Sequence, residues 1–151
     1  MEGAEGAIAG PFMSHQEHHS LQIVHRPSGD PTRTQQLGPY GIEGLVDRDE
    51  AGAGTVWRVR IEPHQRTAVS FHRVAEEYYF VLSGSGAAIL DGREYPLRAG
   101  DFLRLPPGVK HGFVTQDEAL ELLDVHTPGC WPDHDTYFAD GPPPDGFAGP
   151  T

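Results

Sequence analysis

Residues 70–84 form the sequence Ser-Phe-His-Arg-Val-Ala-Glu-Glu-Tyr-Tyr-Phe-Val-Leu-Ser-Gly, and this segment carries the strongest structural signal in the chain. Its second half is rich in aromatic and β-branched side chains, which is typical of a strand. Alternate side chains of a strand share a face, so Ser70 lies on the same face as His72, and Glu77 lies on the same face as Tyr79. The segment therefore predicts two strands joined by a short corner that brings a histidine near a carboxylate.

Short strand patterns continue on both sides of this segment, and turn residues separate them every 8–12 residues or so. The expected strands are 55–61, 67–72, 77–82, 87–90, 93–97, 102–105, 110–115 and 120–126, with another candidate at Leu21–His25. The dipeptide Asp91-Gly92 is a strong hairpin signal, and Ser83-Gly84-Ser85-Gly86 is expected to form a turn. No segment has a sustained helical period, so we predict an all-β sandwich or barrel.

Composition excludes several classes of partner. The chain has 151 residues, with 22 acidic and 11 basic residues and a net charge of -11. Such a surface repels nucleic acid and anionic membranes, so neither is an expected partner. The single cysteine rules out an internal disulfide, and the sequence contains no signal peptide or membrane-spanning apolar run. By elimination we expect a cytoplasmic protein.

The chain divides by composition into three parts. Residues 1–20 are expected to be a flexible leader, and their histidines, His15, His18 and His19, are interpreted as part of a solvated tail. Residues 21–140 are expected to form the barrel domain with a C-terminal extension. Residues 141–151, rich in proline and glycine, are predicted to be a frayed tail.

The spacing in the central segment resembles the first sequence motif of the cupin superfamily. That motif contains His-x-His, then a glutamate, then a glycine; here four residues separate His72 from Glu77, and six separate Glu77 from Gly84. Two positions depart from the motif, because Ser70 replaces its first histidine and His64 replaces its opening glycine. A serine hydroxyl is a poor ligand beside imidazole, so the resemblance implies three protein ligands where the family has four.

The second motif of the family is matched at Gly100, Pro106, Gly108 and His111. Thr115 stands where the motif has asparagine. The resemblance covers roughly residues 55 to 126 and implies a single cupin-type double-stranded β-helix, a jelly-roll barrel. Because this fold hosts many reactions, the resemblance is far less specific for the reaction than for the fold.

Two histidines and one carboxylate make the facial arrangement that holds a divalent metal and leaves positions open. We therefore predict that His72, Glu77 and His111 bind iron, manganese, nickel or zinc inside the barrel. Three residues are candidate catalytic groups: Ser70, Tyr79 and His64. Alternation predicts that Glu76 points outward, whereas the interior is expected to hold Tyr79, Phe113 or Phe102. His126 and His134 are expected on the surface or in a lid.

These residues predict a metal-dependent enzyme that acts on a small oxygen-rich molecule. A dioxygenase is the first hypothesis, because it is the commonest use of an iron site with these ligands. A metal-dependent isomerase or epimerase, decarboxylase or cyclase is the first alternative, and a non-enzymatic barrel that binds a small ligand is the second. Exposed sheet edges also favour a homodimer, with Leu21–Val24 as a candidate for strand exchange.

Overall fold

Burial alternates along most strands, as expected for sheets that keep one face on the core. In the strand at Thr55–Ile61 the buried residues are Thr55, Trp57, Val59 and Ile61, while Arg58 and Arg60 face solvent. The computed structural model describes residues 22–50 and 52–147. The predicted leader, residues 1–20 with its histidines, lies outside the described residues.

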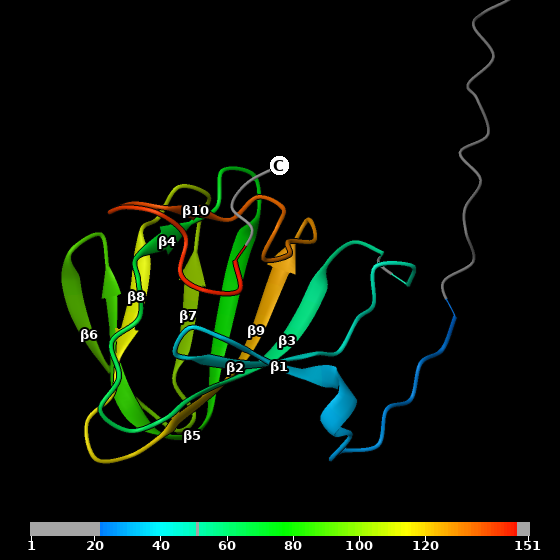
Figure 1. The fold of residues 1–151 in the computed structure, drawn as a ribbon, viewed down its shortest axis with the longest axis horizontal. Coiled ribbons are helices and arrows are strands. Elements are labelled where there is room, and N and C mark those ends of the chain that lie inside the picture. The colour runs from blue at the N-terminus through cyan, green and yellow to red at the C-terminus, as the bar shows by residue number, and fades with distance from the viewer. Residues whose placement is uncertain (1–21, 51, 148–151) are drawn as a thin grey trace, which may run out of the picture.

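Ten strands and one short 3-10 helix make up the described structure (Figure 1). The elements are η1 (Pro31–Arg33), β1 (Thr34–Leu37), β2 (Tyr40–Gly44), β3 (Thr55–Ile61), β4 (Ser70–Phe71), β5 (Glu76–Leu90), β6 (Arg93–Arg98), β7 (Phe102–Leu105), β8 (His111–Val114), β9 (Leu120–Thr127) and β10 (Tyr137–Phe138). No helix among the described residues is long and apolar enough to cross a membrane.

All strand pairs are antiparallel, and the sheet curls into a half-barrel in the order β1-β2-β3-β9-β5-β8-β4-β10. The long strand β5 joins the two sides of the fold. Its first part pairs with β7 and β9, and its second part pairs with β6 and β8. The prediction of an all-β cupin-type barrel is confirmed. Strand β5 contributes to both halves of the fold, because its two parts pair with different strands.

The predicted turn at residues 83–86 is wrong, because these residues lie inside β5. The strand continues there through a register shift between Val81 and Ser83 in its pairing with β9. Gly84 has a φ of +77°, and a Cβ added to it would lie 1.7 Å from the carbonyl oxygen of Ala119. The glycine therefore marks an irregularity where two backbones approach closely, not the end of a strand.

The prediction of a strand at Leu21–His25 is also wrong for the described part of that range, because residues 22–27 are in no strand. The proposed exchange of this segment in a dimer therefore loses its structural basis. Two strands that the sequence did not predict, β1 and β2, extend the sheet beyond β3, and β10 pairs with β4. The predicted strand 67–72 shortens to Ser70–Phe71.

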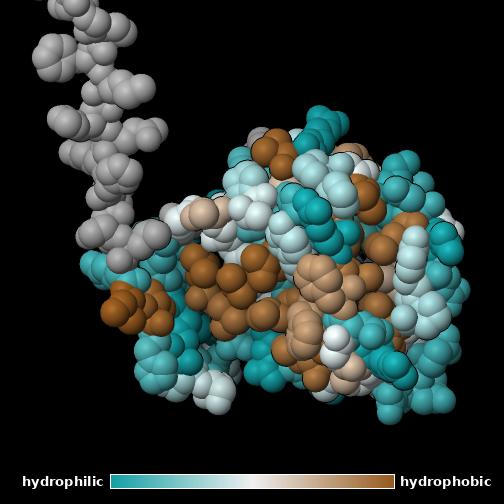
Figure 2. Space-filling view, turned by 180° about the vertical axis from the view of Figure 1, so that it is seen from behind, coloured by the Kyte–Doolittle hydropathy of each residue, from teal (hydrophilic) through white to brown (hydrophobic). Residues whose placement is uncertain are grey.

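The core lies between the curled halves, and Phe113 is buried in it, whereas Phe102 is 60% exposed. The expectation that Phe102 points inward is therefore wrong. It pairs with Phe80 across β7 and β5, and with Leu82 these two side chains form an outer apolar patch on the sheet. Figure 2 shows the molecule from behind, where apolar and hydrophilic side chains share the surface.

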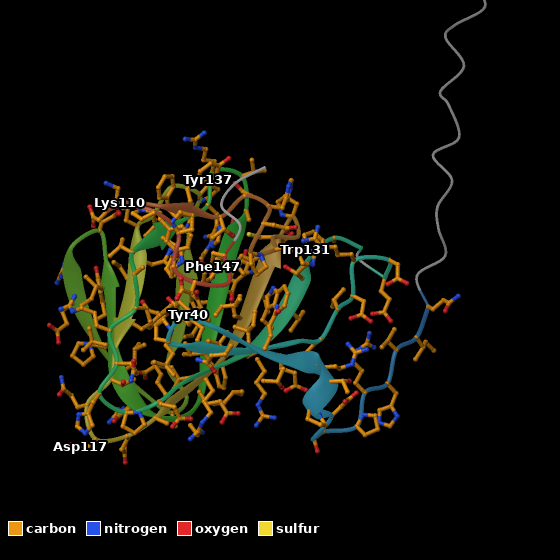
Figure 3. All side chains as sticks on the ribbon, in the orientation of Figure 1. Tyr40, Lys110, Asp117, Trp131, Tyr137 and Phe147 are labelled. Atoms are coloured by element: carbon orange, nitrogen blue, oxygen red, sulfur yellow. The ribbon has the colours of Figure 1, made fainter. Side chains whose placement is uncertain are left out.

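The C-terminal segment crosses the front of the sheet near β4 and β10 (Figure 1). Phe147 lies in the predicted frayed tail, yet its ring packs edge-on against Tyr40 and Phe138, with centroids 6.5 and 5.1 Å away. Figure 3 shows Tyr40 and Phe147 next to each other on this side of the barrel. Phe147 therefore contributes to the wall of the barrel interior.

Candidate metal centre

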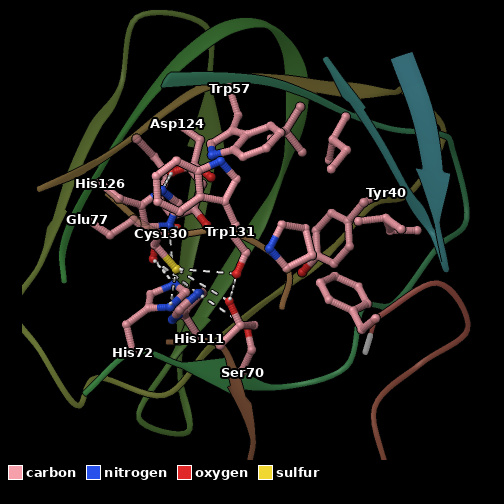
Figure 4. A pocket seen from close by; sticks show the side chains of 17 residues that line it. Tyr40, Trp57, Ser70, His72, Glu77, His111, Asp124, His126, Cys130 and Trp131 are labelled. Carbon is pink, nitrogen blue, oxygen red and sulfur yellow. Dashed lines mark hydrogen bonds and ion pairs between the residues drawn. The ribbon is translucent and has the colours of Figure 1, made fainter. Parts of the chain in front are cut away.

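Four strands bring the site residues to one end of the interior (Figure 4). Ser70 on β4 pairs with His111 on β8, and Glu77 on β5 pairs with His126 on β9. His72 follows β4 and faces the same cavity. Because directly opposed strand residues have Cβ atoms about 4.5–5.5 Å apart, the two cross-strand pairs fix which side chains meet.

The carboxylate of Glu77 stands at the centre of three imidazoles. Its Oε2 atom lies 3.3 Å from Nε2 of His72 and 3.1 Å from Nε2 of His111, and its Oε1 atom lies 3.0 Å from Nε2 of His126. All four residues are buried, and Glu77 is only 2% exposed. The structure therefore brings together the three residues expected to bind metal, His72, Glu77 and His111, and adds one more histidine.

Backbone carbonyls set the orientation of two of these rings. Nδ1 of His72 lies 2.7 Å from the carbonyl oxygen of Asp135, and Nδ1 of His111 lies 3.0 Å from that of Val109. A carbonyl only accepts, so each Nδ1 carries the proton that it donates. In the neutral ring the Nε2 atom then holds a lone pair, which is the form that binds a metal.

The electrostatics of the site favour positive charge beside Glu77. Burial pushes the pKa of Glu77 upward, but the neighbouring His111 and His126 outweigh it and hold the pKa well below its ordinary value. Burial alone would lower the pKa of His72, yet its hydrogen bonds to Cys130 and Glu77 raise the pKa to about 11. Burial lowers the pKa of His111 more than the Glu77 charge raises it. A buried carboxylate facing imidazole lone pairs requires a proton or a cation between them.

The residues fit a divalent ion. Glu77 Oε2 is buried without a hydrogen-bond partner, although two Nε2 atoms point at it. The ligand atoms of His72, Glu77 and His111 lie within 4.8 Å of one another. Two atoms bound at about 2.1 Å to one ion lie roughly 3.0–3.4 Å apart in tetrahedral or octahedral geometry. The distances from Glu77 Oε2 to the Nε2 atoms of His72 and His111, 3.3 and 3.1 Å, match this range. Nitrogen and oxygen donors of this kind suit zinc, iron, manganese or nickel.

The three candidate catalytic residues divide between the interior and the surface. Ser70 is buried with its Oγ 3.4 Å from Nε2 of His111, and Tyr79 is buried in the same cavity. His64 is misplaced by the prediction, because its side chain is 69% exposed and lies beside Asp117. It follows β3 in a loop with a φ of +59°, so it turns away from the barrel. Glu76 points outward to Arg104, as alternation predicted.

Sequence reasoning missed three possible metal ligands that line the cavity: Asp124, His126 and Cys130. His126 was expected on the surface or in a lid, but it is 5% exposed, so that expectation is wrong. His134 is exposed. The signal was present in β9, because Leu120 and Leu122 face inward and strand alternation then places Asp124 and His126 on the same face.

The cavity beside the cluster has aromatic walls and a volume of about 80 Å³. Its wall includes Tyr40, Trp57 and Trp131, which Figure 4 labels, and Phe147 near the C-terminus. Among the residues that the structure describes, no lysine or arginine lines it. Burial together with the charges of Asp124 and Glu77 raises the pKa of Tyr79 well above its ordinary value, so its hydroxyl stays protonated. Burial also raises the pKa of Tyr40, so the interior is a small apolar pocket with metal-ligand chemistry and two protonated phenols.

Three comparisons place this structure among known proteins. The sequence of CurC, a polyketide synthase from Streptomyces cyaneus, is 32% identical over 77 residues, covering 50% of each chain. A sugar phosphate isomerase from Silicibacter pomeroyi is 26% identical, covers 70% of this chain and 68% of its own, and has a TM-score of 0.58. The Streptomyces nucleoside dehydratase Pac13 is 18% identical, covers 76% and 92%, and has a TM-score of 0.60.

The chain spans 63% of the length of one curated relative that it matches and 50% of another. The sequence family described as the cupin domain matches residues 57–126, which run from β3 to β9 and include the three residues expected to bind metal. The solved structures share the same barrel. Family match, fold and motif positions agree, and residues 57–126 form a small cupin domain.

Proposed function

We propose that this chain is a metal-dependent enzyme that performs non-redox acid–base chemistry on a small, uncharged carbonyl compound. The observation that carries the proposal is the orientation of His72 and His111, whose Nδ1 atoms face backbone carbonyls while their Nε2 atoms face Glu77. These three residues would hold the ion. When bound, the ion would supply a Lewis acid that polarises a substrate carbonyl.

The walls of the cavity support an uncharged substrate. A phosphate would meet no lysine or arginine there, so the phosphorylated substrate class in the name of the sugar phosphate isomerase is not carried over. Trp57, Trp131 and Phe147 instead offer flat apolar surfaces. CurC is named a polyketide synthase, and polyketide chains carry alternating carbonyl groups whose intervening CH groups are acidic. A compact β-dicarbonyl or β-hydroxycarbonyl compound fits both observations.

Two hydroxyl groups can orient the oxygen atoms of such a substrate. The Tyr79 phenol remains protonated and can donate a hydrogen bond to an oxygen that gains negative charge. The Ser70 hydroxyl, beside Nε2 of His111, can donate to or accept from a neighbouring substrate oxygen. Aromatic walls lower the polarity around such contacts, which strengthens them. These roles suit an isomerase, a dehydratase or a cyclase.

An oxygenase is the second candidate, because two histidines and one carboxylate are the ligand set of many iron-dependent oxygenases. His72, Glu77 and His111 make up that set. The two candidates differ in one measurable requirement: the non-redox reaction runs without dioxygen, and the oxygenase consumes it.

The test uses the full chain purified without a histidine tag, followed by metal analysis. The protein is then incubated without oxygen in deuterated water with a panel of β-dicarbonyl and β-hydroxycarbonyl compounds, and exchange at the acidic carbon is followed by NMR. We expect exchange that depends on the bound ion and disappears in His111→Ala. Substrate-dependent oxygen uptake with no anaerobic exchange would favour the oxygenase. Absence of a bound metal would overturn the proposal in favour of a binding module.

A further inference from the structure

The ligand set of the site extends to β9. Ser70 holds the β4 position that is a histidine in the family motif, and its hydroxyl is a poor metal ligand. On the other side of Glu77, the register of β5 and β9 places His126 directly opposite the carboxylate. The interior thus has an imidazole that the motif does not contain, next to a carboxylate that has lost one of its usual imidazole neighbours.

The position of the His126 ring fits coordination. Its Nε2 atom lies 3.0 Å from Oε1 of Glu77 and 3.3 Å from Nε2 of His72. Both separations fall within the roughly 3.0–3.4 Å expected for neighbouring ligand atoms on one ion. The rings of His126 and His72 meet edge to face, with centroids 4.7 Å apart, so neither ring blocks the other from a shared point.

The second ring nitrogen of His126, Nδ1, lies close to the carboxylate of Asp124. Nδ1 of His126 and Oδ1 of Asp124 are 3.6 Å apart, and both atoms are buried without a hydrogen bond. Metal-bound histidines usually donate their second N–H to a carboxylate or a carbonyl, which fixes the tautomer. A movement of a few tenths of an ångström would close this pair and leave Nε2 of His126 free for the ion.

We propose that His126 is a fourth protein ligand of the metal ion, replacing the histidine absent at Ser70, and that Asp124 is the positioning residue that holds its Nδ1–H. The inference rests on the proposed function, because it requires that an ion binds at His72, Glu77 and His111. It changes the expected site from two imidazoles and one carboxylate to three imidazoles and one carboxylate.

Cys130 is the competing candidate and lies on the wrong side of His72. Its Sγ atom is 3.3 Å from Nδ1 of His72, the nitrogen that faces away from Glu77. The same sulfur contacts the carbonyl oxygen of His134 at 3.2 Å and Oγ1 of Thr136 at 3.4 Å. These contacts hold the thiol behind the His72 ring, whereas His126 shares the ion-facing side of Glu77.

The test measures zinc affinity by competition with a chelator and records the absorption spectrum of the cobalt(II)-loaded full chain. His126→Ala should weaken zinc binding by at least about 100-fold, beyond the roughly 10–100-fold typical of losing an outer partner, which is the effect expected for Asp124→Asn. The cobalt spectrum should change with His126→Ala. The exposed His64→Ala variant is the matched control and should bind like the unmodified chain.

A rescue variant separates loss of a ligand from loss of the fold. Ser70→His combined with His126→Ala should restore affinity to within about tenfold, because it returns an imidazole to the motif position. If His126→Ala keeps both affinity and spectrum while Glu77→Ala loses the ion, the inference fails and the proposed function stands. If the unmodified chain binds no ion, both fail. A rescue variant that folds but does not recover affinity also overturns the inference.

Discussion

Asp135 fixes the corner that carries His72, so its replacement by asparagine should destabilise the fold measurably. Its carboxylate accepts backbone N–H bonds from Arg73, Val74 and Ala75, at 2.8, 3.1 and 2.8 Å for the shortest contact of each. Its own carbonyl oxygen accepts from Nδ1 of His72 at 2.7 Å. One residue thus holds both parts of this corner: its side chain organises the link between β4 and β5, and its backbone carbonyl orients the imidazole that follows β4.

The cost of Asp135→Asn can be worked from these contacts. The asparagine amide has one acceptor oxygen where the carboxylate has two, so one of the three backbone N–H groups loses its hydrogen-bond partner. The hydrogen bonds that remain are then made to a neutral acceptor. A hydrogen bond to a charged group contributes about 1.5–3 kcal/mol, and a buried N–H left without a partner costs about 1–3 kcal/mol. Only Ala75 is fully buried, at 1% exposed, while Arg73 and Val74 can turn to water. We therefore expect a loss of about 2–4 kcal/mol.

Backbone strain does not enter the comparison, because Asp135 has a φ of +58° and asparagine tolerates that region as aspartate does. The assay is urea unfolding at pH 7, with the exposed Asp140→Asn as a control that should stay within about 0.5 kcal/mol of the unmodified chain. An Asp135→Asn variant that stays within the same limit would refute the reasoning.

The same residue predicts a pH dependence. Burial raises the pKa of Asp135, but the N–H bonds from Ala75, Arg73 and Val74 outweigh it and hold the pKa below its ordinary 3.8. A depressed folded-state pKa stabilises the fold above the unfolded-state value and loses that effect as the pH falls through the folded-state value. The difference between the unmodified chain and Asp135→Asn should therefore be constant from pH 7 to 5 and shrink below about pH 4.

Three further predictions address the site, the backbone and the assembly. Glu77→Ala should abolish metal binding measured by elemental analysis. Glu76→Ala removes a carboxylate that points outward, so it should keep the ion and change stability by no more than about 0.5 kcal/mol. The reverse result would contradict the assigned strand faces. Gly84→Ala should cost about 2–5 kcal/mol in urea unfolding, because it adds left-handed strain and a clash with Ala119, while Gly92→Ala, in open space, should cost only about 1–2 kcal/mol. We also predict a homodimer, so light scattering should give twice the 16.5 kDa chain mass; a monomer at micromolar concentration would refute this.

Local pattern was sufficient to predict the parts of the fold and site that depend on neighbouring residues. The spacing from His72 to Glu77 and the alternation that separates Glu77 from Glu76 are properties of one strand and one corner, and the structure agrees with both. The hairpin at Asp91-Gly92 is of the same kind, because positive φ angles of 48° and 81° are what such a dipeptide accommodates.

Two kinds of feature could not be predicted. Some depend on the pairing of segments far apart in the sequence, and others lie in strands whose sequence does not alternate between apolar and polar residues. The contact between Glu77 and His126 follows from the register of β5 and β9, which includes a shift near Gly84 that no local pattern reveals. Strand β1 exposes three of its four residues, so its sequence does not alternate in hydrophobicity. Phe102 was predicted to point inward by strand alternation, but β7 presents that position to the outside.

The arrangement of atoms around Glu77 explains why a motif alone is a weak guide to the metal site of this barrel. The two carboxylate oxygens contact different imidazoles, Oε1 that of His126 and Oε2 those of His72 and His111, while Nε2 of His126 also lies beside Nε2 of His72. In the proposed metal site the glutamate therefore sets the position of the ion, and inward residues on the strands around it would supply the remaining donors. A serine at the motif position on β4 then removes one donor without removing the charge that attracts the ion. Because strand registers decide which residues face that carboxylate, an inward histidine on β9 is as well placed to complete the set as one on β4.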